Sequence, residues 1–148
     1  MAVGRAFRDA IRVFSANEDY GHLCEAHRAL AELLLAEGKI DEAERHALSA
    51  NEHVSPHDLT SRTSTLTTFA LVRAAQGRAA EAEALLREGL ALLDGTGFKL
   101  LEIEPIAALA EFLRAHDRPA EAAELDARLP DPIPAWLGRQ DARRTTSV

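Results

Sequence analysis

Hydrophobic residues recur along this chain with the 3.6-residue period of an α-helix. In the stretch from about Tyr20 to Glu37, one helical face carries Leu23, His27, Leu30, Ala31 and Leu34. The same period returns in further stretches that are separated by short polar turns. The pattern therefore predicts an all-α chain of about seven helices, over residues 5–16, 20–37, 40–54, 56–76, 79–93, 99–115 and 119–129.

Three of the turns are similar to one another and evenly spaced. A helical run stops at Gly38, Gly77 and Asp117, a basic residue follows, and the next helix opens with Glu-Ala. The spacing between these corner residues is 39 and then 40 residues, a period typical of repeated helix pairs. We expect one repeat domain over 1–129, with a half repeat at 5–16 and helix pairs at 20–54, 56–93 and 98–129. For 130–148 we expect a Pro-rich extended segment and a disordered tail.

Local signals predict where two of the helices begin. Ser55 is expected to be the N-cap of the fourth helix, with Pro56 in its first position. Pro105 predicts either a kink in the sixth helix or a helix that begins at Glu104, because proline has no amide donor. The hydroxyl-rich stretch 60–65 has low intrinsic helicity, so tertiary packing must hold the helix there.

The corners and helix faces together resemble the tetratricopeptide repeat. The family's paired large and small residues in the first helix fall on Leu30 and Ala31, Phe69 and Ala70, and Leu109 and Ala110. Its small residues in the second helix fall on Ala43, Ala82 and Ala122, and then on Ala50 and Gly89. The chain departs from the pattern at Leu34, Arg73, Leu113 and Leu129. Its long helices look like the long-repeat variety found in bacterial signalling proteins and large transcriptional regulators.

The resemblance implies a right-handed α-solenoid that binds a protein or peptide on its concave face. The positions that would face such a partner are Glu25, Arg28, Glu32 and Leu35, then Ser64, Thr67 and Leu71, then Glu104, Glu111 and Arg114. This mixed acidic and apolar surface suits a partner with basic or apolar residues. At the two ends of the array, Phe7, Phe14 and Trp136 are candidates for end caps or for contacts of a homodimer.

Charge and cysteine content narrow the class of protein. The formal net charge is −7 and the pI is about 5.3. No run of Lys or Arg forms a basic stripe that could follow a phosphate backbone, so nucleic acid is not an expected partner. The one cysteine, Cys24, fits a reducing compartment. The chain has no run of 18 apolar residues and its first residues lack a signal-peptide pattern, so we expect no membrane partner and a cytoplasmic location.

No residue pattern indicates catalysis. Cys24 and His27 are one helical turn apart, but no further ligands follow at metal-site spacing, so we expect His27 to be a packed core residue and expect no metal or cofactor. The other histidines form no recognisable triad. Acidic residues at helix starts have a sufficient cause in the helix dipole. The expected function is a non-enzymatic interaction scaffold; the alternatives are a module of a larger regulator that mainly self-associates, and an all-α enzyme.

Overall fold

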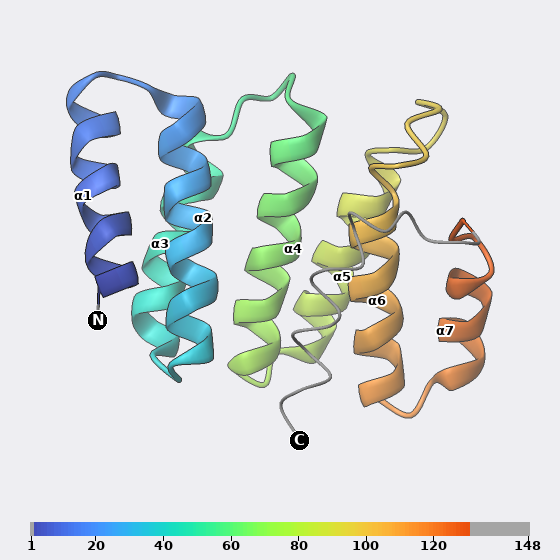
Figure 1. Cartoon of the computed structure of the whole chain (residues 1–148). Helices are drawn as coiled ribbons and strands as arrows, with labels where there is room; N and C mark the ends of the chain where they lie inside the picture. The colour runs from blue at the N-terminus through green and yellow to red at the C-terminus, as the bar shows by residue number, and fades with distance from the viewer. Residues whose placement is uncertain (1, 131–148) are drawn as a thin grey trace.

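A computed structural model describes residues 2–130 of the chain, and within this range it contains seven α-helices and no strand (Figure 1). The helices are α1 (Ala2–Ala16), α2 (Tyr20–Ala36), α3 (Ile40–His53), α4 (Leu59–Ala75), α5 (Ala79–Ala91), α6 (Ile103–Ala115) and α7 (Pro119–Asp126). The prediction of an all-α chain is confirmed. Trp136 and the segment expected to be extended and disordered lie outside the described residues.

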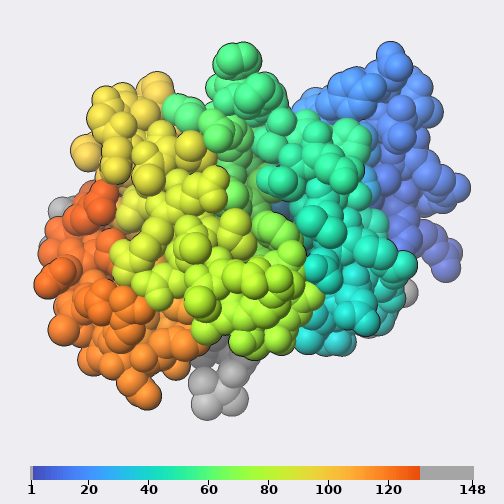
Figure 2. All heavy atoms as spheres, turned by 180° about the vertical axis from the view of Figure 1, so that it is seen from behind, coloured from blue at the N-terminus to red at the C-terminus, as the bar shows by residue number. Residues whose placement is uncertain are grey.

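Each helix packs against the next one along the chain, and α4 also contacts α2 and α6. As a result α2, α4 and α6 stand side by side toward the viewer of Figure 1, while α3 and α5 lie behind them. Figure 2 shows the opposite side, where α3 and α5 form the middle of the surface, with α7 at one edge and α1 at the other. No described helix combines the length and apolar character needed to cross a membrane.

The three predicted corners share one backbone geometry. Gly38, Gly77 and Asp117 all lie in the left-handed region, with φ of 76°, 75° and 58°. At the first corner the amide of Gly38 donates to the carbonyl of Leu35, and the amide of Lys39 donates to the carbonyl of Leu34. This pair of bonds is the Schellman motif, which satisfies the last carbonyls of a helix. The amides at the other two corners donate in the same register: Gly77 to Ala74 and Arg78 to Arg73, then Asp117 to Arg114 and Arg118 to Leu113.

The repeated alanines are buried between packed helices. Ala43, Ala82 and Ala122 are each 0% exposed. Around them the described chain forms two apolar clusters, one centred on α2 and α3 and one that runs through α4, α5, α6 and α7. A methyl side chain lets two helix axes approach closely, and the leucines opposite fill the remaining space.

Ion pairs join the second helix of one pair to a helix of the next pair. Glu44 of α3 accepts from Arg73 of α4, and Glu83 of α5 accepts from Arg118, the N-cap residue of α7, at 2.7 Å. These hydrogen bonds lower the pKa of both carboxyl groups. Glu44 and Glu83 are separated by one repeat length. The same position in the second helices of two successive pairs, α3 and α5, therefore contacts the next pair.

The predicted start of α4 is wrong, and the structure decides between the two alternatives predicted for α6. The N-cap of α4 is Asp58, whose side chain accepts from the amide of Ser61 at 3.0 Å; Ser55 instead closes a turn with the amide of His57. Helix α6 begins at Ile103, one residue before the alternative start predicted at Glu104, whereas the expected start near residue 99 is wrong. Pro105 therefore lies in the first turn. First-turn amides have no partner within the helix, so proline is tolerated there without a kink. Helices α5 and α7 end earlier than expected, at Ala91 and Asp126.

Replacing Gly77 by alanine should lower the free energy of unfolding by about 1 kcal/mol, because an L-residue is strained in the left-handed region. An added Cβ would meet no atom within 4 Å, so the effect is conformational and not steric. Urea unfolding followed by circular dichroism measures the change.

Gly21→Ala is the matched control. Its Cβ would also meet nothing within 4 Å, but Gly21 lies inside α2. The same substitution should therefore raise stability by roughly 0.5 kcal/mol. Two changes of the same sign would contradict the assigned corner conformation.

Candidate functional site

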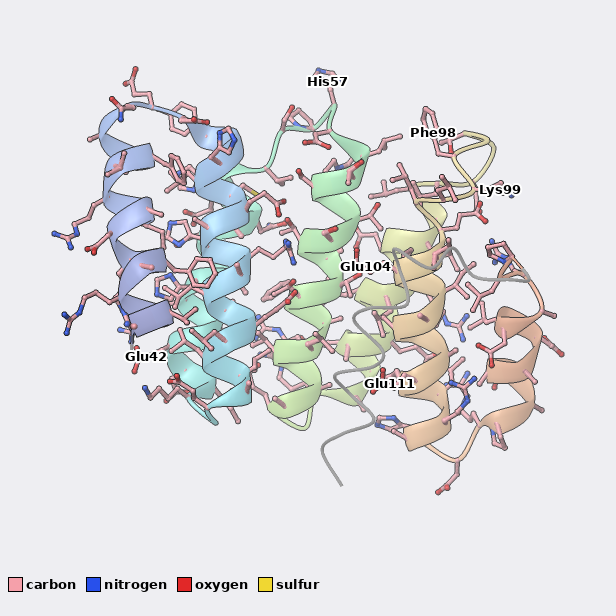
Figure 3. All side chains as sticks on the ribbon, viewed as in Figure 1. Glu42, His57, Phe98, Lys99, Glu104 and Glu111 are labelled. Atoms are coloured by element: carbon pink, nitrogen blue, oxygen red, sulfur yellow. The ribbon has the colours of Figure 1, made fainter. Side chains whose placement is uncertain are left out.

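Polar side chains of α2, α4 and α6 form a network of two hydrogen-bonded groups on the layer that these helices share, one between α2 and α4 and one between α4 and α6. We call this surface the α2–α4–α6 face; it comprises Glu25, Arg28, Glu32, Leu35, Ser64, Leu71, Glu104 and Glu111. The buried Thr68 of α4 lies beneath it and bonds to Glu32. Leu35 follows Arg28 by seven residues, Leu71 follows Ser64 by seven, and Glu111 follows Glu104 by seven, and this spacing returns a side chain to nearly the same helical face. Figure 3 shows Glu104 and Glu111 projecting from α6 on the side that faces α4.

Arg28 lies at the centre of the network. Its Nε and Nη2 atoms donate to one oxygen of Glu25 at 3.1 and 2.9 Å, and its Nη1 donates to Glu32 at 2.9 Å. Burial by itself would lower the pKa of Arg28, but the bond to Glu25 and the charges of Glu32, Glu25 and Glu104 outweigh burial and raise that pKa. The guanidinium is therefore permanently charged and held in one orientation by carboxylates.

Two hydrogen bonds join α4 to its neighbours, one to α2 and one to α6. The hydroxyl of Thr68 in α4 donates to Glu32 of α2 at 2.7 Å. The hydroxyl of Ser64 in α4 donates to Glu104 of α6 at 3.3 Å. Helix α4 thus links the carboxylates of its two neighbours. Four glutamates and one arginine, Arg28, leave this face with an excess of negative charge.

The structure brings together most of the residues expected to face a partner. Glu25, Glu32, Glu104 and Glu111 lie on its exposed or half-exposed surface, and Leu71 is 40% exposed. Leu35 is half-buried and packs against the cluster of α2 and α3.

Thr67 and Arg114 do not contribute to this face. Thr67 is buried, and its hydroxyl donates to the carbonyl of Thr63 one turn earlier. Helix α4 contacts α2, α3, α5 and α6, so more of its circumference is covered than that of the other helices. Arg114 pairs with Asp126 of α7. The expectation that Thr67 is open to a partner is therefore wrong.

The aromatic residues of α1 already have neighbours within the chain. Phe7 packs with Ile11 against the cluster of α2 and α3. The ring of Phe14 stacks on His22, with 5.3 Å between ring centroids. Both side chains are half-buried. Two valines of α1 remain outside these contacts: Val3 is 58% exposed and Val13 is 55% exposed.

A histidine cluster between α2 and α3 was not predicted from the sequence. The Nδ1 atoms of His27 and His46 are 2.9 Å apart, so one ring donates and the other accepts. The ring of His27 also stacks on His53, and His53 stacks on Tyr20. Burial, followed by the charges of His46 and His53, lowers the pKa of His27 to about 4. Burial also lowers the pKa of His46. The sequence did contain one signal for this cluster: His27 lies on the apolar face of its helix, and the corner at Gly38 brings the next helix, which carries His46, against that helix.

Cys24 and His27 point to different neighbours although they are one turn apart. The thiol of Cys24 lies 3.6 Å from the hydroxyl of Thr65 in α4, and burial raises the pKa of Cys24. His27 instead contacts α3. Among residues 2–130, no group of three or more His, Cys, Asp or Glu side chains is placed to hold a metal ion.

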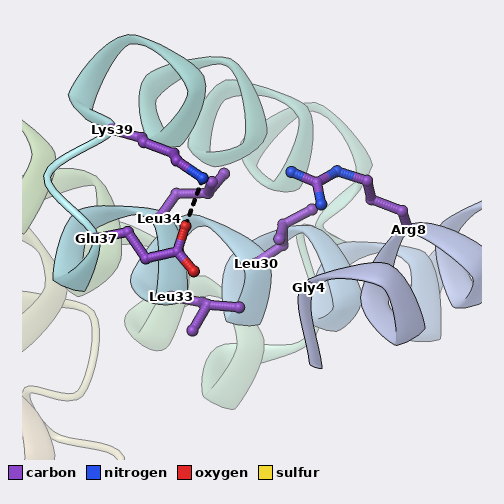
Figure 4. Close-up of a pocket in the computed structure, with 7 residues that line it drawn as sticks. All are labelled: Gly4, Arg8, Leu30, Leu33, Leu34, Glu37 and Lys39. Carbon is purple, nitrogen blue, oxygen red and sulfur yellow. Dashed lines mark ion pairs between the residues drawn. The ribbon is translucent and has the colours of Figure 1, made fainter. Parts of the chain in front are cut away.

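Two hollows lie away from the α2–α4–α6 face. One, of about 40 Å³, lies between α1 and α2 beside the ion pair of Glu37 and Lys39 (Figure 4). Arg8 and Gly4 of α1 line its other side. This volume is far below the roughly 300–1,000 Å³ of small-molecule sites. A more open depression of about 350 Å³ is lined by residues of α5, α6 and α7, with Leu113 and Leu125 among them.

Comparison with known proteins adds no relative: no protein-family model and no curated protein matches this chain.

The histidine cluster should make stability depend on pH. Because the pKa of His27 falls from 6.5 to about 4 on folding, the unfolded chain binds the proton more readily. The contribution to stability is complete above pH 6.5 and is lost as pH falls toward 4. Urea midpoints measured across this window should fall with pH, and they should fall less steeply for His27→Gln.

His57→Gln is the control, since His57 is exposed in the turn before α4. It should keep the slope of the unaltered chain between pH 6.5 and 5, a range above the ordinary pKa of carboxyl groups. Equal slopes for His27→Gln and the unaltered chain would remove His27 as the cause.

Proposed function

We propose that this chain is a repeat protein of the tetratricopeptide type and acts as a non-enzymatic scaffold that binds a protein or peptide. In this proposal the helix pairs form a right-handed α-solenoid. The even spacing of Gly38, Gly77 and Asp117 supports it, as does their common Schellman geometry. The stacking of each helix on the next also supports it, because repeat arrays build their core from contacts between neighbours.

The bridged network of the α2–α4–α6 face is the observation that carries the binding proposal. Arg28, Glu32 and Thr68 hold one another in place before any partner arrives, so less side-chain entropy is lost on binding. The excess of glutamates favours a segment that carries Arg or Lys, and Leu71 offers an apolar contact beside them. Cys24 is buried and forms no disulfide, which agrees with a soluble protein in a reducing compartment such as the cytoplasm.

Self-association as a module of a larger bacterial regulator is the second candidate function. The exposed Val3 and Val13 on α1 favour it, because an apolar helix face at one end of an array can pack against another subunit. A concentration series in light scattering separates the two candidates. A monomer at every concentration removes the self-association role and leaves the scaffold proposal intact.

Selection from a displayed random-peptide library should return peptides enriched in Arg or Lys. The double variant Glu104→Lys and Glu111→Lys should weaken a selected peptide by roughly tenfold or more, since like charges then face each other. Fluorescence anisotropy of the labelled peptide measures this change.

Glu52→Lys with Glu88→Lys is the matched control. It makes the same change of charge at exposed positions of α3 and α5, the other layer of helices. This variant should keep the affinity within about twofold, because its charges lie more than a Debye length, about 8–10 Å, from the bound peptide. Equal loss in both variants, or peptides without basic enrichment, would overturn the assignment of the face.

A further inference from the structure

The sequence that follows the described residues has the opposite charge to the α2–α4–α6 face. After Pro130 it contains Arg139, Arg143 and Arg144 together with Asp131 and Asp141, so its side chains carry a formal net charge of +1, with the three arginines in its second half. The whole chain has a net charge of −7, so this arginine-bearing segment has the opposite sign of charge to the rest of the chain. Opposite charges on two parts of one chain favour their contact at moderate salt concentration.

The described chain ends close to this face. Arg128, just after α7, places its Nη2 atom 3.7 Å from a carboxylate oxygen of Glu102, the N-cap residue of α6. Glu104 lies two residues further along and accepts from Ser64 of α4. The segment beyond Pro130 therefore starts near the N-terminal end of α6, where the face begins.

The available length of chain is sufficient. Extended backbone spans at most about 3.3–3.6 Å per residue, so the ten residues from Leu129 to Arg139 can reach about 35 Å. Glu104 and Glu111 are about 10 Å apart along α6, at 1.5 Å of rise per residue. Packed helices are about 8–10 Å apart, so α2 lies roughly 20 Å from α6 across the layer. Arg139 and the arginines that follow can reach both Glu104 and Glu111.

The face also has the chemistry to hold a further guanidinium. Arg28 is an example of such binding on this face, because its guanidinium nitrogens donate hydrogen bonds to Glu25 and Glu32, each at 2.9 Å. Glu104 is exposed, and among the described residues its hydrogen bond comes from the neutral hydroxyl of Ser64. Charge-assisted bonds from arginine to carboxylate are roughly twice as strong as neutral ones.

We propose that the arginines at 139, 143 and 144 dock on the α2–α4–α6 face around Glu104 and Glu111, so that the chain's own C-terminal segment occupies the partner site. This inference rests on the proposed function of that face, and it adds regulation: an external basic peptide has to displace the segment. Because the segment is tethered, its effective concentration is in the millimolar range, and even weak docking competes.

Backbone amide NMR of the full chain tests the docking. Replacing the three arginines with Arg139→Gln, Arg143→Gln and Arg144→Gln should shift amide signals around Ser64, Glu104 and Glu111. The control Arg5→Gln, Arg12→Gln and Arg45→Gln removes the same charge from exposed positions on α1 and α3 and should leave those signals in place. Changes restricted to residues 131–148, or spread over α3 and α5, would overturn the proposal.

A charge swap provides the second arm of the test. Arg139→Glu, Arg143→Glu and Arg144→Glu should release the segment, and adding Glu104→Arg with Glu111→Arg should restore docking with reversed charges. Failure of the swap to restore the shifts counts against direct pairing. Shifts that grow with protein concentration would assign the occupant to the segment of a second copy and overturn the intramolecular contact.

Binding of the selected peptide separates this inference from the proposed function. If the segment docks, the triple glutamine variant should bind the peptide about three- to tenfold more tightly than the unaltered chain. Unchanged affinity, with binding still lost in Glu104→Lys and Glu111→Lys, defeats the inference and leaves the scaffold proposal standing. Docking seen by NMR without any peptide binding defeats the scaffold proposal and keeps the contact.

Discussion

The left-handed corner residue is the constraint on which the rest of this molecule depends. At Gly38, Gly77 and Asp117 the backbone takes a conformation that costs an ordinary L-residue about 1–2 kcal/mol. In return two amides satisfy the last carbonyls of the helix, and the chain leaves in a direction that lays the next helix against it. Glu18 adopts the same geometry between α1 and α2, so the fold imposes this corner even where no glycine or aspartate is present.

A repeated corner places equivalent residues in equivalent surroundings. Ala43 and Ala82 each follow their corner by the same number of residues, and both are fully buried where two helices meet. Glu44 and Glu83 come next in sequence and reach the following helix pair. In each repeat, the alanine packs the two helices of one pair together, and the glutamate directly after it forms an ion pair with the next helix pair.

Because the second layer takes up these contacts, α2, α4 and α6 keep one face that no other described helix covers. Helix α4 is the link, since Ser64 and Thr68 bond to carboxylates of both neighbours. Its threonines lower the intrinsic preference for helix, yet four of them are buried and held by packing. The hydroxyl groups that weaken α4 as an isolated helix are the ones that join it to α2 and α6.

The sequence by itself determined the helical class, the period and the corners, because hydrophobic spacing and left-handed residues act over a few neighbouring positions. It also indicated the four glutamates of the face, because their positions follow from the register of the helices. Only the tertiary structure decided that Thr67 is buried, that Arg114 forms an ion pair with Asp126, and that His27 forms a hydrogen bond with His46. These outcomes depend on which helix covers which side, and residues as far apart as His27 and His46 meet only after the helices pack.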